Sequence, residues 1–231
     1  ILDLMFNRSK RMGELLELKA EDNHIFSAYI SQPSEKPIAG IVILQEIFGV
    51  NKHIKEVTDL YASKGYLSIA PALFDRIENS VELEYNENGV NKGRKLKELC
   101  DKNALKDIDA AISVVSSAGK VGIIGYCWGG SLSWRMACQS NNLSASVCYY
   151  GGDIPKLQNL EPKCGVLTHF GELDQGIPIE SVEVFKSVKP EVITYTYPAD
   201  HGFNCDHRKQ YCQVSTKVAL DRTLKFLRVN L

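Results

Sequence analysis

The chain has 231 residues, of which 44% are hydrophobic and 24% are charged, and its formal net charge is −1. This length suits one large domain with a substantial core, and we expect a single domain over residues 1–231. The balanced charge, without a basic block, argues against nucleic acid and an acidic membrane surface as partners. No apolar run approaches the ~18 residues that a membrane-spanning helix needs.

The chain start and the cysteines together predict a cytoplasmic protein. Residues 1–12 lack the apolar segment and the small-residue cleavage site of a signal peptide. The seven cysteines are an odd number, scattered without C-x-x-C pairs or zinc-ligand spacing, so reduced thiols are the simplest account. No helical segment shows an apolar face that demands a partner, and we expect a monomer or a weak oligomer.

Short β-branched runs alternate along the chain with longer segments of helical periodicity. The first two strands should pair antiparallel, and the nearly all-apolar run at 38–45 is typical of a strand buried on both faces. Such alternation indicates an α/β fold, a mostly parallel central sheet with helices on both faces. The predicted strands lie near 14–19, 24–31, 38–45, 66–70, 121–124, 143–150, 164–170 and 192–197, and the predicted helices begin near residues 51, 92, 105, 128, 178 and 209.

The strand at 121–124 runs into Gly125-Tyr126-Cys127-Trp128-Gly129, a G-x-S-x-G nucleophile elbow with cysteine in place of serine. The strand must reverse into a helix within a few residues, and the two glycines leave room for a close crossing. The first N–H groups of that helix would favour a thiolate and later an oxyanion. The alternative is a buried core cysteine beside a strand-to-helix turn.

Reactive side chains also follow other predicted strands. Glu46 follows the third strand, and Asp174 and His201 follow the last two. Ligands of open α/β sheets bind beyond the carboxyl ends of the strands, so these groups should meet at one edge. The chain order of nucleophile, acid and histidine is that of α/β-hydrolases, which makes Cys127, Asp174 and His201 the candidate catalytic triad.

Several segments resemble the dienelactone hydrolase (carboxymethylenebutenolidase) family. They are QEIFGVN at 45–51, GYCWGG at 125–130, the glycine followed by Asp174, and HGF at 201–203. The likeness extends over about residues 13–230. It implies an α/β-hydrolase fold and the hydrolysis of a small lactone or ester, with no cofactor.

The resemblance also implies roles for residues beside the triad. In the family the glutamate that matches Glu46 pairs with an arginine at rest, then swings to deprotonate the thiol when an anionic substrate arrives. The backbone N–H groups of Ile47 and Trp128 are the expected oxyanion hole. The alternative for Glu46 is a strand-end acid that only caps backbone donors.

The arginines are where the match weakens, because the family uses two of them to hold the substrate carboxylate. Arg76 and Arg94 are the candidates for the first, with Arg94 slightly preferred, and each could instead be a solvated surface charge. Four residues after His201, where the second arginine would stand, the chain has Cys205, and Arg208 is the nearest substitute. Its displacement puts the family's own lactone in doubt as the substrate.

Aromatic residues complete the expected substrate pocket. Tyr149 and Tyr150 end a predicted strand, and we expect Tyr149 to line the pocket while Tyr150 fills the core. Phe48, in the QEIFG segment, is a further expected contact. A cluster of potential metal ligands follows the last strand, but no second cluster supplies ligands at a recognised spacing, so no metal site is predicted. The cluster consists of His201, Cys205, Asp206 and His207.

The sequence therefore predicts a cysteine hydrolase of a small lactone or activated ester, expected to carry a carboxylate, that works through an acyl-thioenzyme. Two alternatives stay open. The same triad could act on a thioester or an unrelated ester, or a non-hydrolytic thiol redox or binding protein could use the same cavity. A complete triad argues against the second, because binding alone has no need for an aligned Asp and His.

Overall fold

The computed structural model describes residues 13–231, and all of its strands join one sheet. The strands are β1 (Glu14–Lys19), β2 (Ile25–Ser31), β3 (Gly40–Leu44), β4 (Leu67–Pro71), β5 (Val121–Tyr126), β6 (Ala145–Tyr149), β7 (Gly165–Gly171) and β8 (Ile193–Tyr197). Their order across the sheet is β1-β2-β4-β3-β5-β6-β7-β8. β2 pairs antiparallel with β1 and β4, and every other pair is parallel, as the alternating pattern predicts.

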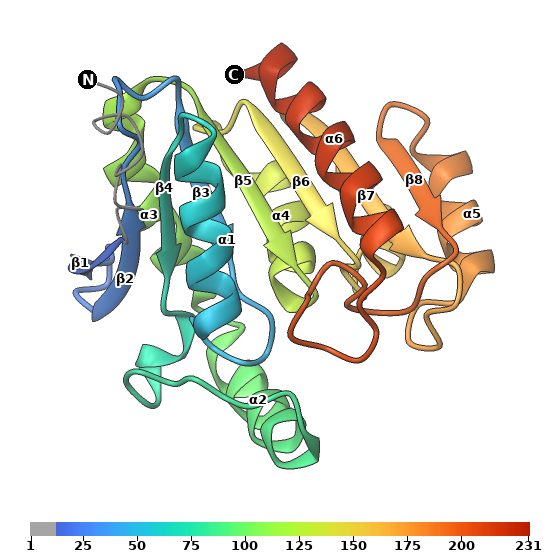
Figure 1. Ribbon diagram of the computed structural model, residues 1–231, viewed down its shortest axis with the longest axis horizontal. Helices are drawn as coiled ribbons and strands as arrows, with labels where there is room; N and C mark the ends of the chain where they lie inside the picture. The colour runs from blue at the N-terminus through green and yellow to red at the C-terminus, as the bar shows by residue number, and fades with distance from the viewer. Residues whose placement is uncertain (1–12) are drawn as a thin grey trace, which may run out of the picture.

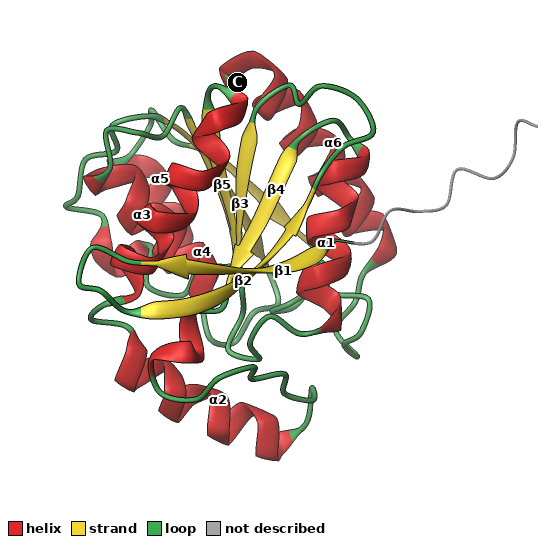
Figure 2. Ribbon diagram, turned by 90° about the vertical axis from the view of Figure 1, so that its left-hand side faces the viewer, coloured by secondary structure: helices red, strands yellow, loops and turns green. Residues whose placement is uncertain are grey.

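Helices cover both faces of this sheet (Figures 1 and 2). α1 (Lys52–Ser63) and α6 (Gln213–Asn230) lie on one face, and α3 (Ala104–Val115) and α4 (Trp128–Gln139) lie on the other. α5 (Ile179–Val188) packs on α4, where the ring of Phe185 meets that of Trp134 edge to face at 5.4 Å. α2 (Glu87–Cys100) lies below the carboxyl edge of the parallel strands in Figure 1.

The central strand β3 shows why a nearly all-apolar run forms a strand here. All five of its residues are buried, and successive side chains point to opposite faces of the sheet. Ile41 and Ile43 join the core on the α1 and α6 side, whereas Val42 and Leu44 join the core under α3. A strand covered on both faces leaves no position for a polar side chain, so the expected double burial is confirmed.

Two predicted helix starts were wrong by several residues. α2 begins at Glu87 rather than near residue 92, because the Asn86 side chain caps it by accepting the Gly89 N–H at 2.9 Å. α6 begins at Gln213 rather than near residue 209, because the chain first makes a series of turns between Cys205 and Cys212. Both errors fall in long connections at the carboxyl edge, where hydrophobic periodicity carries little information.

The described part of the chain also bears on the compartment and membrane expectations. None of the helices within residues 13–231 combines the length and the hydrophobicity needed to cross a membrane. All seven cysteines are free thiols. The expectation that no signal peptide is present concerns residues 1–12, which lie outside the described residues.

Candidate active site

Cys127 lies at the apex of the turn between β5 and α4. Its backbone has φ 56° and ψ −115°, on the left-handed side that a residue with a Cβ seldom adopts. Close crossing explains the flanking glycines. A Cβ on Gly125 would stand 1.9 Å from the Gly129 carbonyl oxygen, and a Cβ on Gly129 would stand 2.5 Å from the Leu44 carbonyl oxygen. The turn therefore has the local structure that the elbow pattern predicts.

The neighbouring strand and the start of the helix hold the backbone of Cys127. Its N–H donates to the Tyr149 carbonyl at 3.0 Å, and its carbonyl accepts the Ser131 N–H at 3.2 Å. The Trp128 N–H lies in the first turn of α4, where backbone donors have no partner within the helix. The thiol is half-buried, so a small reactant can approach it.

Asp174 and His201 come from the turns after β7 and β8, and they form a close pair. Nδ1 of His201 lies 2.6 Å from Oδ2 of Asp174, whose side chain is almost fully buried. The other Asp174 oxygen accepts the Gly176 N–H at 2.8 Å, which fixes the carboxylate in the turn. The ring of Tyr150 packs beside the imidazole, with 5.0 Å between the ring centroids.

The charge state of His201 reflects two opposing effects. Burial disfavours the imidazolium, but the neighbouring Cys127 side chain and the Asp174 carboxylate outweigh burial and raise the pKa of His201 to about 10. The Cys127 side chain lies close enough to the imidazole to influence its charge. The structure thus brings Cys127, Asp174 and His201 together as the sequence pattern predicts.

Glu46 follows β3 and is buried, with 1% of its surface exposed. Nη1 of Arg208 donates to Oε1 of Glu46 at 2.8 Å, and the Tyr85 hydroxyl donates to Oε2 at 3.0 Å. Burial opposes the charge on Arg208, but the Glu46 carboxylate outweighs it and raises the pKa of Arg208. Cys127 also contributes to this raised pKa, so the thiol lies within electrostatic range of Arg208. Phe48 is buried beside this pair, with the guanidinium carbon of Arg208 5.8 Å from its ring centre.

The partner of Glu46 is therefore Arg208, neither of the two arginines considered for that pairing. All three nitrogens of the Arg76 guanidinium already have partners elsewhere. They donate to Asp107 at 2.7 and 2.8 Å and to Asp22 at 3.0 and 3.2 Å. Arg94 is exposed on α2. Sequence spacing alone did not find Arg208 for this role, because it lies three residues beyond Cys205, the position that the family pattern indicates for the other arginine.

Both tyrosines after β6 are almost fully buried, with Tyr149 1% and Tyr150 0% exposed, and the one in contact with the candidate triad is Tyr150 rather than the expected Tyr149. Tyr149 is 1% exposed, and its hydroxyl bonds to Thr223 of α6 at 2.8 Å, so it is a core residue. Tyr150 is the one that contacts His201. The physical reason is alternation at the strand end, since Tyr149 points toward α6 and Tyr150, with φ 40°, turns toward the carboxyl edge.

Tyr85 is a site residue that the sequence did not indicate. It lies in the Glu- and Asn-rich stretch before α2, and its hydroxyl accepts from Asn51 at 3.1 Å while it donates to Glu46. Burial and the nearby Glu46 charge raise the pKa of Tyr85, so the hydroxyl stays protonated and keeps donating. No motif marks this residue, and only the packing of its loop on the site reveals it.

An eight-stranded, mostly parallel sheet with a reactive elbow at its carboxyl edge is the α/β-hydrolase fold. The model of the dienelactone hydrolase family matches residues 26–231. The carboxymethylenebutenolidase of Pseudomonas putida is 30% identical over 228 residues, which cover 94% of this chain and 96% of that protein. The chain therefore belongs to the dienelactone hydrolase family, and it is a carboxymethylenebutenolidase-like hydrolase of the carboxylic ester class.

Further relatives agree in sequence and in structure. A Methylorubrum extorquens protein assigned as a carboxymethylenebutenolidase is 32% identical over 208 residues, which cover 81% of this chain and 71% of that protein. A crystal structure of a Klebsiella pneumoniae protein assigned to the dienelactone hydrolases has a TM-score of 0.78 at 28% identity. That match covers 92% of this chain and 98% of the other.

Proposed function

We propose that this protein hydrolyses a small lactone or activated ester with Cys127 as the nucleophile. The observation that carries the proposal is the meeting of the elbow thiol with the His201–Asp174 pair. The thiolate attacks the carbonyl carbon, the bond to the leaving oxygen breaks, and His201 protonates that oxygen. Water then attacks the thioester while His201 takes its proton, and the acid and the thiolate are released.

Backbone donors and Asp174 assist these steps in the proposal. The N–H groups of Ile47 and Trp128 bind the oxyanion, because one follows the nucleophile and the other belongs to the loop after β3. Asp174 holds the tautomer and the orientation of His201 through its 2.6 Å contact. Phe48 and Tyr150 form walls of the substrate pocket. Arg94 stays a proposed contact of the substrate at the outside of this pocket.

We further propose that the substrate carries a carboxylate, which competes with Glu46 for Arg208. A planar guanidinium suits a carboxylate, and Arg208 is mostly buried with only one contact to Glu46, at Nη1. When the substrate takes Arg208, Glu46 loses that partner and can act as a base toward the thiol. While Arg208 holds Glu46, the thiol keeps its proton, and this limits its oxidation between turnovers.

The experiment that tests this function compares wild type with Cys127→Ala on dienelactone and on p-nitrophenyl acetate. Turnover should vanish in the variant, while wild type should form an acyl adduct on Cys127 that decays, as seen by mass spectrometry. Matched esters with and without a carboxylate test the substrate class. Retained turnover in Cys127→Ala would exclude the mechanism, and a Cys127 that shows only stable oxidation would favour a redox or binding protein.

The remaining expectations form part of the same proposal. Residues 1–231 act as one α/β-hydrolase domain on a small molecule, in the cytoplasm, as a monomer or weak oligomer. Seven free thiols support a reducing compartment, and the net charge of −1 gives no basic surface for nucleic acid. An ester or thioester without a carboxylate stays the alternative substrate, and equal rates on the matched esters would favour it.

A further inference from the structure

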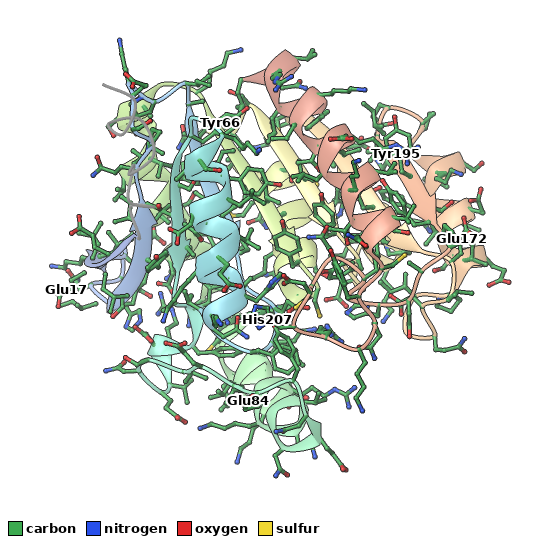
Figure 3. All side chains as sticks on the ribbon, in the orientation of Figure 1. Glu17, Tyr66, Glu84, Glu172, Tyr195 and His207 are labelled. Atoms are coloured by element: carbon green, nitrogen blue, oxygen red, sulfur yellow. The ribbon has the colours of Figure 1, made fainter. Side chains whose placement is uncertain are left out.

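Four side chains with metal-binding chemistry meet where α1 faces the segment after His201. His53 and Glu56 are three residues apart on α1 and share one face of the helix. Asp206 and His207 lie in the turns that follow the site histidine. Figure 3 shows His207 near the end of α1 that adjoins the carboxyl edge of the sheet. The hydrolytic mechanism uses none of these four residues.

The ligand atoms of His53, Asp206 and His207 are close enough to share one ion, and Glu56 adjoins this group through its contact with His207. Nε2 of His207 lies 2.7 Å from Oε2 of Glu56 and 3.8 Å from Oδ1 of Asp206, and Nδ1 of His53 lies 3.5 Å from the same Asp206 oxygen. One ligand atom each of His53, Asp206 and His207 lies within 4.8 Å of the others. Around Zn²⁺, ligand atoms at about 2.0–2.2 Å from the metal stand roughly 3.3–3.5 Å apart. Small side-chain shifts would therefore bring the ligand atoms to the separations found around a bound Zn²⁺ ion.

The burial of His53 is an independent indication. Its side chain is only 4% exposed, which holds the ring in one orientation with Nδ1 toward Asp206. The 3.5 Å separation is too long for a good hydrogen bond, so Nδ1, the nitrogen directed at Asp206, is available to a metal ion. The ring of His207 lies 5.7 Å from that of His53, so two imidazoles from distant parts of the chain face two carboxylates. Lys52 approaches only the other oxygen of Glu56, at 3.8 Å.

We propose that His53, Glu56, Asp206 and His207 bind one divalent transition-metal ion, for which Zn²⁺ fits best. Two imidazole nitrogens and two carboxylate oxygens form a donor set that suits Zn²⁺, while Mg²⁺ and Ca²⁺ prefer oxygen alone. The ion ties α1 to the segment that ends in Arg208, the residue next to His207 and the partner of Glu46. Its role is to fix the position of that arginine, and it takes no part in the bond-breaking steps.

Calorimetric titration with ZnCl₂ tests the site on the purified protein, with wild type, His207→Ala and Asp206→Asn compared. Both altered side chains are partly exposed, so the variants should fold. We expect one ion per chain in wild type and affinity at least about tenfold weaker in each variant. His24→Ala, which removes a histidine from the β1–β2 connection, is the matched control and should bind as wild type does. Zn²⁺ should also raise the Tm of wild type more than that of His207→Ala.

The thiol of Cys127 beside His201 is a competing zinc ligand, and Co²⁺ separates the two sites. Bound by imidazole and carboxylate, Co²⁺ should show visible ligand-field bands without the near-ultraviolet charge-transfer band that a thiolate ligand produces. Three results would overturn the proposal: no binding to wild type, undiminished affinity in both variants, or a Co²⁺ spectrum that reports thiolate ligation alone.

Discussion

His201 is the residue in which burial and charge are most directly opposed. Its imidazole is largely enclosed, which by itself would favour the neutral form, yet the ion pair with Asp174 and the nearby Cys127 side chain raise the pKa of His201 well above its ordinary range. In the proposed mechanism, an imidazolium that persists at neutral pH can protonate the leaving oxygen once the substrate has triggered ionisation of the thiol. The same ion pair connects catalysis to folding, because whatever stabilises the charged His201 also stabilises the folded chain.

Wild type should therefore lose stability relative to His201→Gln as the pH rises. Because folding raises the pKa of His201 from 6.5 to about 10, its stabilising contribution is complete below pH 6.5 and is lost as the pH approaches 10. Urea unfolding of both proteins at several pH values measures this difference in free energy, which should shrink by more than about 1 kcal/mol. A difference independent of pH would show that the imidazole is neutral in the folded protein.

Glu46 illustrates how a buried charge is kept at a site. Its two carboxylate oxygens have different partners, a charged donor in Arg208 and a neutral one in Tyr85. A buried carboxylate without such partners would be costly, and this cost argues that a displaced Glu46 finds a new partner at once. In the proposed mechanism, that new partner is the proton of the Cys127 thiol.

At the scale of elements, the crossing of β5 and α4 determines where the thiol stands. The strand and the helix approach so closely that backbone atoms are the nearest neighbours of both elbow glycines. Backbone atoms cannot yield locally, so any added atom must shift the whole helix. The positive φ of Cys127 is maintained by this packing and by the bond from its N–H to β6.

Gly129→Ala should consequently destabilise the fold and misplace the nucleophile. The new Cβ would stand 2.5 and 2.7 Å from the carbonyl oxygens of Leu44 and Gln45, and overpacking of this kind costs about 1–3 kcal/mol. Gly152→Ala is the matched control, since its Cβ would meet nothing closer than 3.9 Å. Denaturant unfolding of the two variants checks the ranking, and equal stabilities would mean that the crossing can relax.

At the scale of the whole molecule, Arg76 ties together parts that are far apart in sequence. It lies in the short helical turn at Leu73–Arg76 after β4 and bonds to Asp107 on α3 and to Asp22 in the β1–β2 connection. Asp107 is fully buried, and burial raises its pKa although Arg76 acts in the opposite direction. An arginine considered for substrate binding thus joins the antiparallel edge of the sheet to a helix layer.

Removing Arg76 should cost far more stability than removing an exposed lysine. Arg76→Ala leaves the Asp107 charge buried without a partner, for which a loss of about 3–5 kcal/mol is expected. Lys92→Ala, which breaks a pair with Glu78 that is nearly half exposed on both sides, should cost less than about 1 kcal/mol. Thermal unfolding compares the stabilities of the two variants. A stable Arg76→Ala protein with weakened binding of carboxylate esters would show that Arg76 binds the substrate.

The sequence by itself determined the features that depend on neighbours in the chain. Alternating runs predicted the α/β fold, and the elbow pattern predicted the turn at Cys127, because strand, turn and helix there involve only about ten consecutive residues. Asp174 and His201 were also predictable, because parallel strands place their carboxyl ends at one edge. The starts of α2 and α6 were missed where capping and loop turns, rather than periodicity, set the boundary.

Only the tertiary structure decided which side chains meet across long loops. The Glu46–Arg208 pair spans 162 residues, and Tyr85 and the His53–His207 contact likewise depend on how connections fold back over the carboxyl edge. No local pattern encodes such contacts, because a loop can reach the same edge by many paths of similar length. The path is selected by burial and charge pairing in the assembled molecule, and those energies exist only once the sheet has formed.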